Sequence, residues 1–372
     1  MKQRVYLDHN ATSFMRPSLQ QHGLGDIPLN ASSMHQEGQK ARKYIETARL
    51  RIKEQLLWPQ ATLIFTATAT EANNQLLHGV AHRSLIISGG EHPSIVKPAS
   101  KKGAIIIPLL ANGLVNLELL EKALQHAPAP ALLSVMAVNN ETGVIQPMAQ
   151  IGELAAKYGA IFHSDCVQAA GKIAIDITAW QLQALTLSGH KLGGGTGAAA
   201  LLLEKGLECK ALLEGGGQES YARAGTENVM AIHYFSLALQ EALHDMPSYQ
   251  TRLRPWRDTM EQALLLHCPE LVIFGQNAPR VANTSCFGIA GWEAQKQLMG
   301  LDLAGIAVGS GAACSSGKLQ ASSVLQSMGV ADDLARSSLR VSFGWNSVEN
   351  DGPQFVKEWT RLYDRFQNRV NL

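Results

Sequence analysis

The chain has 372 residues, a formal net charge of +1, 46% hydrophobic residues and 17% charged residues. This length suffices for two domains, and the near-neutral charge argues against binding to nucleic acid or a membrane surface. We expect no membrane span and no secretory leader, because long apolar runs are missing. The five cysteines are scattered and form no CxxC pair, so we expect neither a disulfide framework nor structural zinc, and a reducing cytoplasm.

Strands and helices alternate through the first half of the chain. Apolar residues at helical spacing predict an amphipathic helix over residues 39–57, which Pro59 ends. Strands are predicted at residues 63–65, 85–88, 104–107, 131–136, 160–163, 184–187 and 198–203, with helices at 71–82, 117–125 and 151–158. This alternation predicts a mainly parallel seven-stranded sheet with helices on both faces, and ligands bind at the carboxyl ends of such strands.

The pattern changes in the last third of the chain. Two long helices are predicted at residues 228–243 and 249–266. They are followed by strands at 271–274 and 283–289, helices at 294–299 and 322–328, a strand at 339–343 and a helix at 353–366. These elements predict a smaller α/β domain.

A lysine follows the sixth predicted strand. Ser188, His190 and Lys191 lie directly after residues 184–187, and the glycine-rich run 192–197 comes next. The strand fixes the backbone, and glycines allow a ligand to approach closely. A partly desolvated lysine has a lowered pKa and is a nucleophilic amine, as a Schiff-base lysine must be. The alternative is an ordinary lysine in a surface turn.

Polar side chains also follow the ends of other predicted strands. Asp165 can pair with a buried cation such as a protonated pyridine nitrogen, and Gln168 can donate to a phenolic oxygen. His92 can stack on a planar ring or move protons. The alternatives are an aspartate that caps the next turn and a histidine with a structural role.

Two more strand ends carry groups that suit a ligand. Residues 66–71, with Ala69 and Thr70, open a helix, and hydroxyls and free N–H groups at a helix N-terminus suit a phosphate. Asn139 and Asn140 offer paired donors and acceptors. Plain capping and an ordinary turn are the alternatives.

Three later segments carry further candidates. Residues 215–226 combine glycines with Arg223 and Thr226, which suits an anion, although a flexible surface loop is the alternative. Cys314 lies in a loop of small residues, as a nucleophile on a moving arm requires, whereas a free cysteine is more often inert and buried. Arg340 lies on a strand and can hold a carboxylate, unless it makes an internal salt bridge.

Together these residues supply a Schiff-base lysine, a carboxylate for a ring nitrogen, a ring-stacking histidine, phosphate donors and a carboxylate fork. The combination predicts pyridoxal phosphate holding an amino acid. The thiol of Cys314 is an additional reagent.

The chain resembles the cysteine desulfurases of the NifS/IscS type in the class V aminotransferase family. The resemblance runs from Tyr6 to about Gly344 in family order, from Tyr6-Leu7-Asp8 and the segment 31–35 to the Arg340 segment. It implies the fold type I of pyridoxal-phosphate enzymes, with a large domain over residues 15–248. A small domain of residues 1–14 and 249–372 would carry the catalytic cysteine loop. It also implies a homodimer with sites at the subunit interface.

The resemblance implies roles for individual residues. Lys191, Cys314 and His92 would be catalytic, and Asn30 and Arg340 would hold the substrate carboxylate. The cofactor-binding residues would be Ala69, Thr70, His92, Asn140, Asp165, Gln168, Ser188, His190, Lys191 and Thr226, the last reaching the phosphate of the partner subunit.

The implied reaction converts L-cysteine to L-alanine and leaves a persulfide on Cys314. The sulfur would pass to an iron–sulfur scaffold or a sulfur carrier, for cluster assembly or for thiolation of tRNA or a cofactor. No resident metal is implied, although Cys314 could ligate an iron–sulfur cluster transiently.

Several positions depart from the family pattern, namely Ala67-Thr68, Cys166, Gly193 to Gly197, Ser220 to Ala222, and Trp345. No required chemical group is missing. One alternative is another pyridoxal-phosphate enzyme of the same fold, such as a selenocysteine lyase or an aminotransferase. Another is a non-catalytic sulfur-relay or assembly partner that has kept the fold.

Overall fold

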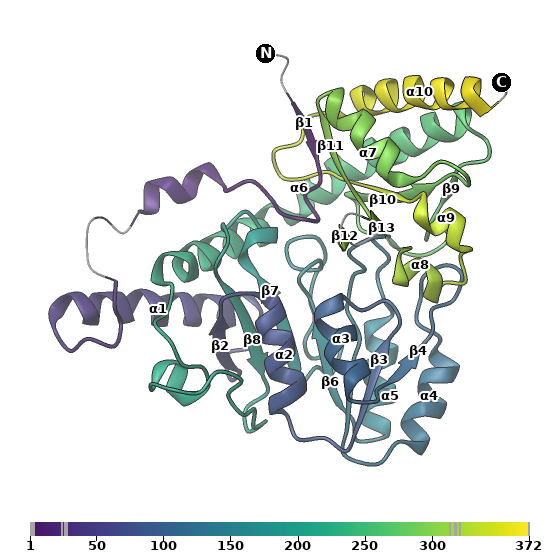
Figure 1. Cartoon of the computed structure of the whole chain (residues 1–372). Helices are drawn as coiled ribbons and strands as arrows, with labels where there is room; N and C mark the ends of the chain where they lie inside the picture. The colour runs from purple at the N-terminus through teal and green to yellow at the C-terminus, as the bar shows by residue number, and fades with distance from the viewer. Residues whose placement is uncertain are drawn as a thin grey trace.

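A large sheet forms the centre of the computed structural model, which describes residues 4–23, 25, 29–311, 314–315, 318–319 and 321–370 (Figure 1). Its strand order is β2 (Thr62–Thr66), β8 (Ala199–Leu203), β7 (Ala184–Ser188), β6 (Ile161–Asp165), β5 (Ala131–Ser134), β3 (Ser84–Ser88) and β4 (Ile105–Ile107). Strand β8 runs antiparallel to both neighbours, and the other pairings are parallel. The prediction of a mainly parallel seven-stranded sheet in an α/β fold is therefore confirmed.

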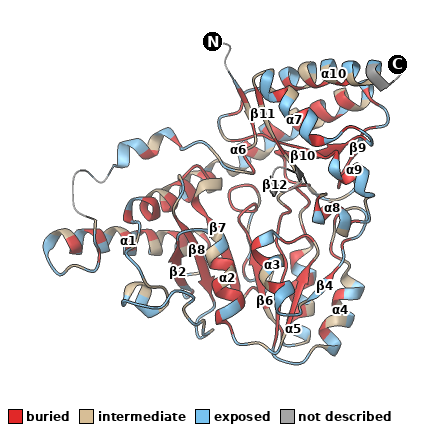
Figure 2. Ribbon diagram, in the orientation of Figure 1, coloured by how far each residue is buried: buried red, intermediate tan, exposed pale blue. Residues whose placement is uncertain are grey.

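Helices cover both faces of this sheet because successive strand residues point to opposite sides. Leu132 packs with helices α2 (Ala69–Gly79) and α3 (Pro93–Lys101) on one face. Its neighbour Leu133 belongs to the other face, with α1 (Gln36–Gln55), α4 (Leu117–His126), α5 (Met148–Lys157) and the first half of α6 (Val229–His267). Figure 2 shows the strands buried between helices whose outer sides are exposed.

A smaller sheet lies beside the large one (Figure 1). Its order is β1 (Val5–Leu7), β11 (Ile306–Ser310), β14 (Leu339–Ser342), β10 (Thr284–Gly288) and β9 (Val272–Ile273). The buried residues of α8 (Ser323–Ser327) and α9 (Asp332–Arg336) belong to the core of the large sheet, whereas helices α7 (Ala294–Leu303) and α10 (Asp351–Val370) pack in the core of the small sheet. Phe287, Phe355 and Trp359 are fully buried in this core. Strand β11 and helix α9 were not predicted from the sequence.

The prediction of two helices over residues 228–266 is wrong, because α6 is one helix of 39 residues with Pro247 and Pro255 inside it. Proline lacks an N–H and normally interrupts a helix. Phe235 in the first half packs into the core of the large sheet, and Leu253 in the second half packs into that of the small sheet. These contacts stabilise the helix on both sides of the prolines.

The division into residues 15–248 and residues 1–14 with 249–372 stays a prediction. Its boundary falls inside α6, and β1 pairs with β11 in the small sheet. In the part of the chain that the structure describes, no helix has the length and apolarity needed to cross a membrane.

Candidate active site

A cavity of about 400 Å³ lies at the carboxyl ends of β2, β3, β5, β6 and β7. The ends of parallel strands meet at one edge of a sheet, so residues far apart in sequence gather there. The predicted site residues that line the cavity are Ala69, Thr70, His92, Asn140, Asp165, Gln168, His190, Lys191 and Arg340. Arg340 comes from β14 of the small sheet, so the cavity lies between the two sheets.

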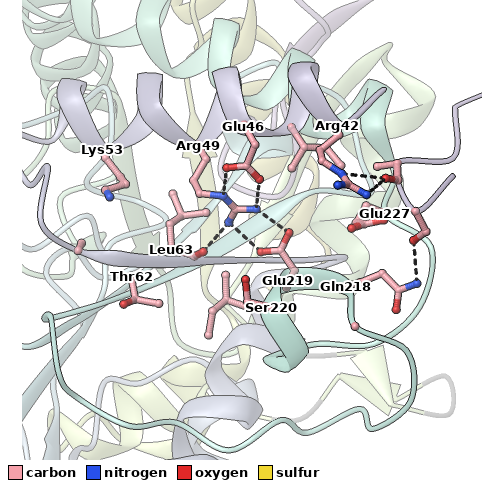
Figure 3. A pocket seen from close by; sticks show the side chains of 16 residues that line it. Arg42, Glu46, Arg49, Lys53, Thr62, Leu63, Gln218, Glu219, Ser220 and Glu227 are labelled. Carbon is pink, nitrogen blue, oxygen red and sulfur yellow. Dashed lines mark hydrogen bonds and ion pairs between the residues drawn. The ribbon is translucent and has the colours of Figure 1, made fainter. Parts of the chain in front are cut away.

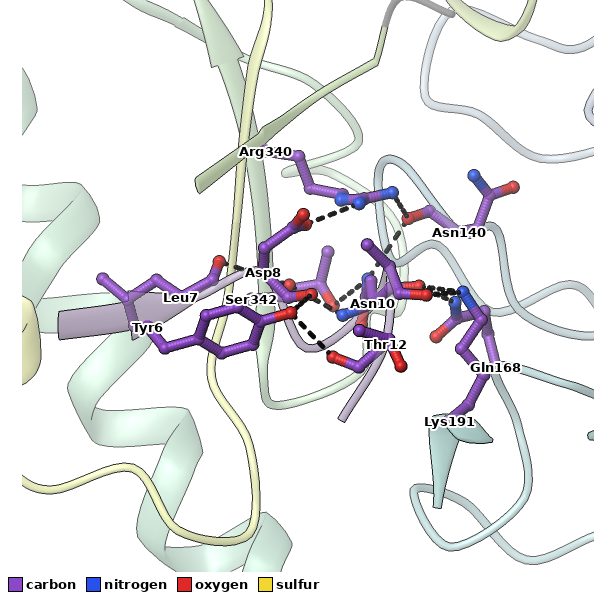
Figure 4. A network of polar contacts seen from close by, with 12 residues as sticks. Tyr6, Leu7, Asp8, Asn10, Thr12, Asn140, Gln168, Lys191, Arg340 and Ser342 are labelled. Atoms are coloured by element: carbon purple, nitrogen blue, oxygen red, sulfur yellow. Dashed lines mark hydrogen bonds and ion pairs between the residues drawn. The ribbon is translucent and has the colours of Figure 1, made fainter. Parts of the chain in front are cut away.

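Lys191 ends the short 3-10 turn η2 (Gly189–Lys191). Its Nζ donates to the backbone oxygens of Asn10 and Ala11, both at 2.5 Å (Figure 4). Burial and the positive charge of Arg340 lower the pKa of Lys191 to about 8, against the opposing effect of Asp8. Near neutral pH a sizeable fraction of the amine is therefore uncharged, which a nucleophilic lysine requires.

Gly193, in the glycine-rich run after Lys191, is packed against the chain itself. Its φ is +86°, and a Cβ there would lie 2.8 Å from the backbone oxygen of Phe14. Arg16 donates its backbone N–H to Gly193 O at 2.9 Å, and Trp345 Nε1 donates to Phe14 O at 3.0 Å. Two departures from the family pattern, Gly193 and Trp345, thus pack on the same segment. Glycine is required here because of the positive φ and the close approach.

Asp165 is buried at the end of β6. Its Oδ2 accepts from Asn73 Nδ2 at 2.8 Å, and its Oδ1 accepts from the backbone N–H of Val167 at 3.0 Å. The bond from Val167 is the turn cap that the alternative hypothesis expects. Asp165 also lines the cavity. A carboxylate held by two donors is oriented to receive a cationic ring nitrogen.

His92 caps α3, and Pro93 occupies the first turn of that helix. Its Nδ1 accepts from the backbone N–H of Ser94 at 3.1 Å. In the neutral ring, the proton is then assigned to Nε2. Burial is the main cause that lowers the pKa of His92, with a smaller contribution from Lys191 and an opposing one from Asp165. His92 therefore both caps α3 and lines the cavity.

The first turn of α2 also faces the cavity. Thr68 is the N-cap residue, and its Oγ1 accepts from the backbone N–H of Glu71 at 3.1 Å. Glu71 in turn accepts from the backbone N–H of Ala67 at 2.9 Å. Capping is thus confirmed, and the N–H groups of Ala69 and Thr70 belong to a first turn without intrahelical acceptors. Such a turn suits an anion.

Arg340 makes the internal salt bridge that was the alternative to a carboxylate fork. One terminal nitrogen donates to Asp8 Oδ1 at 2.7 Å, and the other donates to Asn140 O at 3.0 Å (Figure 4). Its Nε is buried and has no hydrogen-bond partner among the described residues. A Cβ at Gly309 of β11 would lie 2.6 Å from the Asp8 carboxylate, so only glycine leaves room for this pair.

Four predicted residues are not in the cavity wall. Ser188 is buried at the end of β7, and Asn30 is exposed with its Oδ1 accepting from the backbone N–H of Ser32 at 3.0 Å. Thr226 is exposed in the loop before α6. The backbone of Cys314 pairs with Leu319 in a short hairpin, and its side chain lies outside the described residues.

The loop before Thr226 was expected to bind an anion through Arg223, but that side chain is paired within the protein. Arg223, which the sequence suggested for an anion, donates to Glu71 Oε1 at 2.8 Å instead.

Asn10 was not predicted as a site residue from the sequence. It is 2% exposed, and it bonds to β10 of the small sheet and to residues that follow strands of the large sheet. Its Nδ2 donates to Thr284 Oγ1 at 2.9 Å and to Asn140 O at 3.2 Å, and its backbone oxygen accepts from Lys191. The polar run 8–13 was the only signal, and it indicated no more than a turn.

A second cavity, of about 530 Å³, lies between α1 and the segment 217–220. Figure 3 shows Arg49 between Glu46 and Glu219, and its guanidinium binds both oxygens of Glu219 at 2.8 and 2.9 Å. None of the predicted site residues lines it. The cavity beside Lys191 is therefore the candidate active site.

Comparisons with known proteins agree with this geometry. The family model described as aminotransferase class-V matches residues 5–354. An "IscS-like cysteine desulfurase" of Mycobacterium tuberculosis is 37% identical over 93% of each chain. A "Cysteine desulfurase IscS" of Dictyoglomus turgidum is 33% identical over 94% of this chain and 92% of that protein. The X-ray structure of a NifS-like protein from Rickettsia africae has a TM-score of 0.89 and 36% identity, covering 97% of this chain and 99% of that one.

Proposed function

Because the chain belongs to the aminotransferase class-V family, we propose that it is a cysteine desulfurase dependent on pyridoxal phosphate. It removes sulfur from L-cysteine, releases L-alanine and leaves a persulfide on Cys314. The observation that carries the proposal is the gathering of nine predicted side chains, from both sheets, in the wall of one cavity.

The donor groups in the cavity fit the cofactor. Lys191 has a lowered pKa and supplies the amine for covalent attachment, and the held carboxylate of Asp165 suits a protonated ring nitrogen. The open first turn of α2 suits the phosphate, with His190 and Ser188 beside it as the family resemblance implies. When bound, the cofactor supplies a ring that withdraws electrons from the substrate Cα.

The protein's own residues then orient the substrate and move protons. The buried Nε–H of Arg340 has no hydrogen-bond partner among the described residues, so it can donate to one oxygen of the substrate carboxylate. Lys191 and the neutral His92 take and return protons near Cα.

The Cys314 thiolate forms a bond to the substrate sulfur while the carbon–sulfur bond breaks. The electron pair stays with the carbon, which takes a proton and leaves as alanine.

The decisive experiment measures alanine and persulfide from purified protein given pyridoxal phosphate and L-cysteine. Cys314→Ala should abolish both products, whereas the matched control Cys209→Ala, a half-buried cysteine elsewhere, should leave both unchanged. Alanine formation that survives Cys314→Ala would contradict the persulfide step and favour a selenocysteine lyase, whereas a keto acid formed in place of alanine would favour an aminotransferase. A protein that binds no cofactor would favour the non-catalytic relay.

The partners belong to the same proposal. A homodimer would let the exposed Thr226 of one subunit reach the phosphate held by the other, and the persulfide sulfur would pass to an iron–sulfur scaffold or a sulfur carrier. Sedimentation equilibrium tests the dimer, because the proposal requires twice the mass of a single chain. A cytoplasmic location stays a prediction.

A further inference from the structure

A second buried lysine lies close to Lys191. Lys172 is 8% exposed, and its Nζ donates to Asn10 Oδ1 at 2.8 Å and to Gln168 Oε1 at 2.5 Å. Both partners are neutral amide oxygens. Burial of an ammonium group without a carboxylate is costly, so burial, with the charges of Lys191 and Arg340, lowers the pKa of Lys172 well below its ordinary value. An apolar side chain would avoid this cost. We therefore expect the amine of Lys172 itself to have a role.

The amine determines how the two neighbouring amides are turned. The Lys172 amine, charged or neutral, has N–H donors for both contacts, so each amide presents its oxygen to Lys172 and its NH2 group to the other side. Gln168 accordingly donates through Nε2 to the backbone oxygen of Asn10 at 2.9 Å. Asn10 donates through Nδ2 to Thr284 and Asn140. In these orientations both amides are paired with their neighbours. Flipping either amide would turn its NH2 group toward the N–H donors of Lys172.

Both amides belong to the candidate active site. Gln168 and Asn10 line the cavity, and they are 3% and 2% exposed. The Gln168 NH2 group carries two N–H donors, of which the structure shows one bonded, to Asn10 O. The same Asn10 oxygen accepts from Lys191 Nζ at 2.5 Å. Lys172 is thus joined to Lys191 through a single residue.

We propose that Lys172 is a positioning residue that turns the Gln168 amide so that it donates an N–H to the ring oxygen of pyridoxal phosphate. The inference rests on the proposed function, because it takes the cofactor as the occupant of the cavity. Without Lys172, the Gln168 amide can flip and turn its carbonyl oxygen toward the cofactor oxygen, where two acceptors repel each other.

The test is a double-mutant cycle on cofactor affinity of the apoprotein. Lys172→Met keeps the length of the side chain and removes the donors. It should raise the dissociation constant for pyridoxal phosphate about tenfold. Gln168→Met should weaken it to a similar extent, and the double variant should lose no more than either single variant. Fully additive losses, or unchanged affinity in Lys172→Met, would overturn the proposal. The exposed Lys157→Met is the matched control and should bind like the wild type.

A second variant covers the case in which Lys172→Met does not fold. Gln168→Glu keeps a partner for Lys172 and forms an ion pair, but it has no N–H to offer. It should fold and bind pyridoxal phosphate about tenfold more weakly, whereas its affinity for the analogue without the ring hydroxyl should equal that of the wild type. Equal affinity for pyridoxal phosphate itself would refute the donor role of Gln168. A wild-type chain that binds neither compound would instead refute the proposed function.

Discussion

The lowered pKa of Lys191 predicts the pH dependence of cofactor uptake by the apoprotein. Only the uncharged amine attacks the aldehyde of pyridoxal phosphate. With a pKa of about 8, roughly a quarter of Lys191 is uncharged at about pH 7.5, compared with about one part in a thousand for an ordinary lysine. The protein environment therefore accelerates the attachment step roughly 200-fold at this pH through the uncharged fraction alone.

The charges around Lys191 determine the direction of the mutant effects. Arg340 lowers the pKa of Lys191, so Arg340→Met should raise it by about one unit and slow uptake about tenfold at neutral pH. Asp8 raises this pKa, so Asp8→Asn should shift it downward. Arg336→Met removes an exposed arginine of α9 and serves as the control.

Stopped-flow absorbance after mixing apoprotein with pyridoxal phosphate measures the uptake rate. The wild-type rate should rise with pH and level off above about pH 8. The inflection should move up for Arg340→Met, down for Asp8→Asn, and stay in place for Arg336→Met. A wild-type inflection near the ordinary lysine value, or one that ignores both charge changes, would refute this reasoning.

Three further predictions concern the carboxylates and the small core. Burial raises the pKa of Glu141 to about 7, against the hydrogen bond from Ser322 Oγ at 2.5 Å, so its contribution to stability is full below about pH 4.5 and is lost as the pH rises through 7. Glu141→Gln should therefore gain up to about 3 kcal/mol over the wild type across that window in thermal melts, and a pH-independent difference would contradict this. Asp165→Asn should lower kcat for alanine formation about 10- to 100-fold, while the exposed Asp176→Asn should not change it. Trp359→Ala should lower the free energy of unfolding by about 3–5 kcal/mol in urea titrations, with cofactor affinity unchanged.

The sequence alone was sufficient for the parallel sheet and for most of the cavity wall. Strand and helix periods are local, so β5 and α4 could be predicted from their own residues. Polar side chains after strand ends, such as Asp165 and Lys191, were expected to meet because parallel strands end at one edge.

Only the tertiary structure decided the contacts between distant segments. The bond from Arg340 to Asp8 spans 332 positions, and the bond from Lys172 to Asn10 spans 162 positions, so no local pattern predicts either. Helix α6 is continuous because two separate cores hold its halves, although its prolines indicate a break. Local residue patterns determine which groups a strand end carries. Which partner each group meets depends on how the two sheets pack, because hydrogen bonds and charges act over a few ångströms in space, whatever the separation along the chain.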